Sequence, residues 1–92
     1  MTKIEIVREI ASKTGLPTKD VLVIVESLME TIKTSMANGE EVFFRGFGSF
    51  IIKRRAEKTA RDISKNTTVI IPAHDIPAFR PAKEFMEMVS KG

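Results

Sequence analysis

Residues 53–65 hold the densest cluster of charge in this chain, with six basic side chains against two acidic ones. Guanidinium and ammonium groups bind phosphate oxygens through charge-assisted hydrogen bonds, so this run predicts contact with a phosphate backbone. A solvated surface can also carry clustered lysine and arginine, and charge alone leaves that alternative open. The basic residues of the run are Lys53, Arg54, Arg55, Lys58, Arg61 and Lys65.

Catalytic side chains are scarce. The chain has no cysteine and a single histidine, His74, which excludes disulfides, thiolate zinc sites and a cysteine nucleophile. A Ser-His-Asp arrangement or a metal site would depend on that one ring, and we interpret His74 as a surface or turn residue without a role. We therefore expect no enzyme activity, no cofactor and no metal site.

The charge is polarised along 92 residues, a length typical of one small domain. Residues 1–40 carry five basic and six acidic side chains, whereas residues 41–92 carry ten and six. The longest apolar run, residues 21–25, is far shorter than the roughly 20 residues of a membrane span. The N-terminus lacks the pattern of a secretion signal, so we expect a cytoplasmic protein.

The first 40 residues are expected to form two helices. Thr2 and Glu5 have the spacing of a capping box, and apolar residues then recur at helical intervals to about Lys13, before Gly15. A second helix is expected from Thr18 to the Asn38-Gly39 pair. Apolar side chains surround most of its circumference, so a second subunit is the natural cover for residues such as Leu28, Met29 and Ile32.

The second half reads as strands followed by a short helix. β-Branched and aromatic residues on both sides of Gly46-Phe47-Gly48 predict a hairpin over residues 42–52. A third strand is expected over Thr67–Ile71 and a final helix over residues 81–89. The order ααβββα predicts one α+β domain with a three-stranded antiparallel sheet.

The segment between the second and third strands has little to bury, because its only apolar side chains are Ala56, Ala60 and Ile63. We expect a two-stranded β-ribbon arm over about residues 53–72 that projects into solvent and can lie along a DNA groove. Strand alternation places Lys53, Arg55 and Arg61 on one face, and Arg54 and Lys58 on the other.

The whole chain resembles the bacterial histone-like DNA-binding family, HU and integration host factor. The motifs that carry the resemblance are Gly46-Phe47-Gly48-Ser49-Phe50, the basic run after it, and Ile76-Pro77-Ala78-Phe79-Arg80-Pro81-Ala82-Lys83, which is more like HU. The resemblance implies an intertwined dimer whose residues 1–40 form a helical base, residues 41–81 a sheet and arm, and residues 82–92 a C-terminal helix. It also implies that two arms hold duplex DNA from the minor groove.

The resemblance further assigns residues. Lys3, Arg80 and Lys83 join the basic run at positions where the family contacts DNA, and Gly46 and Gly48 let backbone amides approach phosphate. The implied dimer core adds Phe43, Phe47, Phe50 and Phe79 to the apolar residues of the second helix.

The arm tip departs from the family, which usually has Asn-Pro where this chain has Asp62-Ile63. Isoleucine is among the apolar side chains that wedge between base steps, so Ile63 is interpreted as an intercalating wedge. Asp62 adds a negative charge next to phosphates, and Met86 stands where relatives often have lysine. Both changes lower the expected affinity.

The leading hypothesis is a nucleoid-associated homodimer that binds duplex DNA with little sequence preference, bends it and compacts it. A heterodimer with a paralogue and binding of structured RNA stay open. The alternatives are a sequence-preferring subunit like integration host factor and a basic dimeric protein-interaction module.

Overall fold

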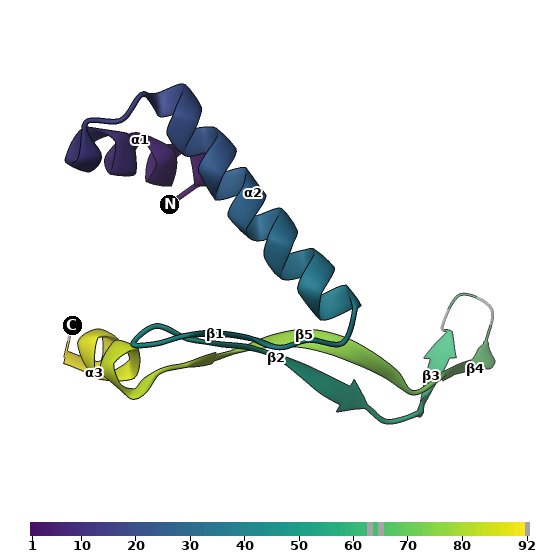
Figure 1. Ribbon diagram of the computed structural model, residues 1–92. Helices are drawn as coiled ribbons and strands as arrows, with labels where there is room; N and C mark the ends of the chain where they lie inside the picture. The colour runs from purple at the N-terminus through teal and green to yellow at the C-terminus, as the bar shows by residue number, and fades with distance from the viewer. Residues whose placement is uncertain (63, 65, 92) are drawn as a thin grey trace.

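The computed structural model describes residues 1–62, 64 and 66–91 and confirms the expected α+β class. Two helices precede five strands, and a third helix closes the chain (Figure 1). The elements are α1 (Lys3–Thr14), α2 (Thr18–Ala37), β1 (Val42–Phe44), β2 (Gly48–Arg55), β3 (Lys58–Asp62), β4 (Thr67–Ile71), β5 (His74–Pro81) and α3 (Lys83–Lys91).

Local signals at its two ends set the bounds of α1. The Thr2 side chain accepts a hydrogen bond from the Glu5 backbone N–H, and the Glu5 carboxylate accepts one from the Thr2 backbone N–H, which completes the expected capping box. Gly15 ends the helix in the left-handed conformation (φ 75°) and donates to the Ala11 carbonyl.

The apolar interior of a single subunit is small. Among the described residues, the buried apolar side chains are Val7 of α1, Val21 of α2 and Ile51 of β2. Much larger apolar surfaces stay exposed along α2, including Leu28 at 47% and Val23 at 59%. This chain alone therefore leaves unburied much of the apolar surface that a domain of its size normally hides.

The main sheet has the order β1-β2-β5 with antiparallel pairing, so the prediction that Thr67–Ile71 forms its third strand is wrong. That strand is β5, which includes His74, expected in a turn, and Pro81, expected in the last helix. Proline lacks the N–H for a ladder bond and is confined largely to edge strands. β5 is an edge strand, and Pro77 pairs there with Ile52.

Thr67–Ile71 instead forms β4, which pairs with β3 in a separate two-stranded arm. Arg55 pairs with His74 and Lys58 with Ile71, so the ladder skips two residues on each strand and resumes without a register slip. Pro72 lies in this interruption, where it has no N–H to donate. The arm therefore continues the β2–β5 ribbon beyond a short break.

The projecting arm gives the subunit an elongated shape (Figure 1). The radius of gyration is 18.6 Å and the longest dimension is 57 Å, whereas a compact chain of this length has a radius of about 12 Å. Among the described helices, none is both long and apolar enough to cross a membrane.

Five phenylalanines connect the sheet to α3. Phe50 of β2 and Phe79 of β5 lie with ring centroids 5.0 Å apart, and Phe85 of α3 stacks on Phe47 at 5.3 Å. Phe44 completes the cluster through edge contacts. This aromatic cluster (Phe44, Phe47, Phe50, Phe79 and Phe85) fixes the β1–β2 turn and α3 against the sheet.

Candidate nucleic-acid interface

The β2–β5 ribbon has two different faces. The C-terminal half of α2 lies on one of them, where Met29, Ile32 and Met36 line a groove together with Phe50 and Ile52. Because side chains alternate along a strand, Ser49, Ile51, Lys53 and Arg55 lie on the opposite face, where Ile51 is buried and the two basic side chains are exposed. We call these the α2 face and the open face.

The open face gathers basic residues from two strands. Lys53 and Arg55 come from β2, and Arg80 of β5 pairs with Ser49 in the same row. Pairing resumes in the same register after the two-residue interruption, and counting strand alternation across it assigns Arg61 of β3 to this row. All four side chains are exposed. The main sheet thus brings Lys53, Arg55 and Arg80 together on one accessible face, and alternation extends the row to Arg61 in the arm.

Arg54 and Lys58 belong to the other row. The Arg54 guanidinium forms an ion pair with Asp75 of β5, with Nη1 3.1 Å from Oδ1. Both side chains are largely exposed, so the pair adds little stability. The alternation predicted from the sequence therefore separates Arg54 from Lys53 and Arg55.

Hydrogen bonds organise the arm tip. The Arg61 guanidinium donates to the Asn66 side-chain carbonyl at 2.6 Å, and Asn66 adopts a left-handed backbone (φ 51°). Asp62 accepts hydrogen bonds from the backbone N–H and the hydroxyl of Ser64. Asp62 thus shapes the turn as well as adding negative charge. Ile63 and Lys65, both predicted to contact DNA, lie outside the described residues.

The remaining predicted DNA ligands lie outside this row. Lys3 forms an ion pair with Glu26 of α2 at 2.9 Å, in the helical layer, and Lys83 is the first residue of α3. Gly46 has a left-handed φ of 82° in the β1–β2 turn. Gly48 is buried, and a Cβ there would lie 2.5 Å from Phe79, so packing explains that glycine.

The predicted dimer residues are mostly exposed in the isolated subunit. Leu28 and Met29 of α2 and Phe47 and Phe79 of the aromatic cluster are 37–47% accessible, and Ile32 and Phe50 are partly buried in the groove beneath α2. Phe43 differs from them, because it pairs with Ser49 on the open face and is 70% exposed.

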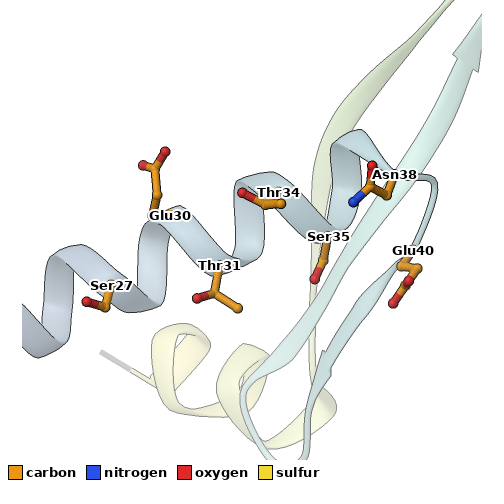
Figure 2. Close-up of a pocket in the computed structure, with 7 residues that line it drawn as sticks. All are labelled: Ser27, Glu30, Thr31, Thr34, Ser35, Asn38 and Glu40. Carbon is orange, nitrogen blue, oxygen red and sulfur yellow. The ribbon is translucent and has the colours of Figure 1, made fainter.

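A second groove runs along the hydroxyl-bearing side of α2 (Figure 2). In this view Ser27, Thr31 and Ser35 point to the side of α2 on which α3 lies, and Glu30 points to the opposite side. Among the described residues that line the groove are two carboxylates and no lysine or arginine. Its charge does not suit a phosphate backbone, which leaves the open face as the candidate interface.

Sequence reasoning missed two exposed side chains of the open-face row. His74 begins β5 directly opposite Arg55, and Ile70 of β4 lies opposite Thr59 with 63% of its surface accessible. Both residues could be identified only from the pairing register, which requires β4 to be assigned to the arm and β5 to the main sheet.

A projecting β-ribbon with a basic row beside an aromatic-lined sheet is an arrangement of nucleic-acid-binding proteins. The family model described as "Bacterial DNA-binding protein" matches residues 1–90. The chain is 44% identical to integration host factor subunit beta of Marinobacter nauticus, covering 98% of this chain and 93% of the relative. It is 35% identical to DNA-binding protein HU of Thermus thermophilus, covering 99% and 94%.

Among solved structures, an HU–DNA cocrystal structure from Anabaena superposes with a TM-score of 0.94 at 33% identity, covering all of both chains. HU from Thermotoga maritima gives a TM-score of 0.67 at 31% identity, covering 97% of this chain and 98% of that one. The chain therefore belongs to the bacterial DNA-binding protein family, which includes HU and integration host factor. Relatives of both names occur at comparable identity.

Proposed function

We propose that this protein is an architectural DNA-binding protein that holds duplex DNA against the open face and along the arm, and that it acts by binding and bending without catalysis. The observation that carries the proposal is the single row of Lys53, Arg55, Arg80 and Arg61 on the face that α2 leaves uncovered. Such a row matches the phosphates of a duplex, and it predicts affinity with little sequence preference.

The supporting contacts come from the other predicted basic residues. Further contacts are proposed for Lys58 on the second row, Lys83 at the start of α3 and Lys3 in the helical layer. Arg54 is engaged by Asp75 and is expected to contribute less. Lys65, also predicted to contact DNA, lies outside the described residues. Family membership supports this reading, because an HU–DNA complex superposes on the whole chain. In a bacterial cell the proposal implies association with the nucleoid.

The test is fluorescence anisotropy of a labelled random-sequence duplex titrated with protein at several salt concentrations. The four contacts of the open-face row in each of two subunits are expected to contribute about −7 to the slope of log affinity against log salt. Arg55→Ala removes one contact per subunit and is expected to reduce the slope by about 1.8. An unlabelled duplex that carries one defined binding sequence should not displace the protein from the labelled duplex much better than an unlabelled random-sequence duplex does.

Arg54→Ala is the matched control, because it removes the same side chain one residue away on the row that pairs with Asp75. It is expected to change the slope by less than half as much as Arg55→Ala. Equal effects of the two substitutions, or binding that does not respond to salt, would show that the open face is not the interface.

We further propose that Ile63 inserts at a flexible base step, as apolar wedges of minor-groove binders do. Ile63→Ala is then expected to reduce the DNA bend more than the affinity, since the phosphate contacts stay in place. Energy transfer between dyes at the two duplex ends measures the bend. An unchanged transfer efficiency with the substituted protein would eliminate the wedge.

The working unit in this proposal is a dimer. The uncovered apolar residues of α2 and the partly exposed aromatic cluster, which includes Phe47 and Phe79, border the same side of the sheet. A second copy with the same surfaces would cover them and would present two arms to one duplex. Residues 1–40 would then form the helical base, and the arm would reach beyond it.

A further inference from the structure

His74 is an exposed side chain of the open-face row that the proposed function does not use. It is the first residue of β5, at the end of the strand that borders the interruption in the ribbon, and it pairs directly with Arg55. Its side chain is exposed. Directly paired side chains on one face lie about 5 Å apart, so a phosphate held by Arg55 is within reach of the imidazole.

A backbone contact fixes the hydrogen-bonding roles of the ring. Nδ1 lies 2.9 Å from the carbonyl oxygen of Pro72, and because a carbonyl can only accept, Nδ1 carries the proton of that bond. In the neutral ring Nε2 then has a lone pair, which repels a phosphate oxygen. Protonation places an N–H at Nε2 and gives the ring a positive charge, so the same nitrogen becomes a phosphate donor.

The charged neighbours of the ring come from β2 and from the interruption that follows it. Arg55 lies opposite, Lys53 lies diagonally on the same face, and alternation places Glu57 next along the row. β5 is an edge strand, so no further strand borders the ring on its outer side within the described sheet. A bound phosphate would interact favourably with the protonated ring and with both cations.

We propose that His74 is a DNA phosphate ligand that operates in its protonated form, so that each subunit gains one phosphate contact when the ring carries a positive charge. The inference rests on the proposed DNA interface. It predicts that complex formation takes up protons and that affinity rises toward acidic pH, with the contact at the root of each arm.

The experiment repeats the salt titrations with a random-sequence duplex at about pH 5.5 and about pH 7.5, chosen on either side of the reference pKa of histidine, about 6.5. For the wild-type protein we expect the slope of log affinity against log salt to be steeper at the lower pH by about 0.9 per histidine, or about 1.8 for two arms. His74→Gln is expected to remove this difference. His74→Lys, which keeps a positive charge throughout, is expected to give the steeper slope at both pH values.

Proton NMR provides a second measurement. His74 is the single histidine of the chain, so the imidazole ring signals can be assigned to it without ambiguity. Adding duplex should move the midpoint of the ring's pH titration upward. Wild-type slopes that agree at both pH values, or a pH dependence retained by His74→Gln, would overturn the role of His74. The proposed function would still stand in that case, provided that the affinity falls steeply with salt. Absence of DNA binding at both pH values would overturn the proposed function and this inference together.

Discussion

Gly48 shows how one position can couple the DNA-binding face to the aromatic cluster. A Cβ at this residue would lie 2.5 Å from the ring of Phe79 and 2.6 Å from the Arg80 carbonyl oxygen. The ring could shift, but the carbonyl belongs to the β2–β5 ladder and cannot move without breaking it. Gly48→Ala is therefore expected to lower the free energy of unfolding by about 1–3 kcal/mol.

Urea unfolding at fixed protein concentration measures this effect as a lower midpoint with an unchanged dependence on denaturant. Gly39→Asn is the matched control, because Gly39 has open space around it and asparagine tolerates its left-handed backbone. We expect the Gly39 variant to unfold close to wild type. A Gly48 variant as stable as the Gly39 variant would contradict the packing explanation.

At the scale of elements, the helices followed from the sequence because their signals are local. The capping pair Thr2 and Glu5 and the left-handed Gly15 mark α1 without reference to the rest of the chain. The strand β5 was missed because Pro77 and Pro81 resemble loop residues, and only its edge position makes them acceptable in a strand. The neighbouring Thr67–Ile71 was correctly predicted as a strand and lies within the arm predicted over about residues 53–72, but it is not the third strand of the main sheet.

The candidate site likewise combines features that local sequence patterns predict with features that depend on tertiary structure. Alternation separated Arg55 from Arg54 correctly, because a period of two depends only on the extended backbone. Which face of the sheet lies toward α2 depends on tertiary packing, because Ile32 and Met36 of α2 line a groove with Phe50 and Ile52, which are distant in sequence. The pairing of His74 with Arg55 likewise depends on register, which is set only when β2 and β5 meet. Local patterns supply the residues, and tertiary packing decides which of them share a surface.

The whole molecule is understandable only with a second copy, because one subunit leaves too much apolar surface uncovered to be stable by itself. Leu28 on α2 is 47% exposed in the isolated chain and lies among other uncovered apolar residues of that helix. We expect sedimentation to give twice the 10.3 kDa chain mass. Thermal unfolding should begin at higher temperature as protein concentration rises, since association stabilises the folded state by mass action.

Leu28→Ala distinguishes this assembly from a chance association. If Leu28 is buried between subunits, its truncation costs about 2–5 kcal/mol at each copy and should produce concentration-dependent dissociation together with a lower unfolding temperature. Phe43→Ala is the matched control, because Phe43 is 70% exposed on the open face, opposite the aromatic cluster. It should leave the dimer mass unchanged. Dissociation caused by Phe43→Ala and not by Leu28→Ala would place the subunit interface on the open face, where it would exclude DNA from the basic row.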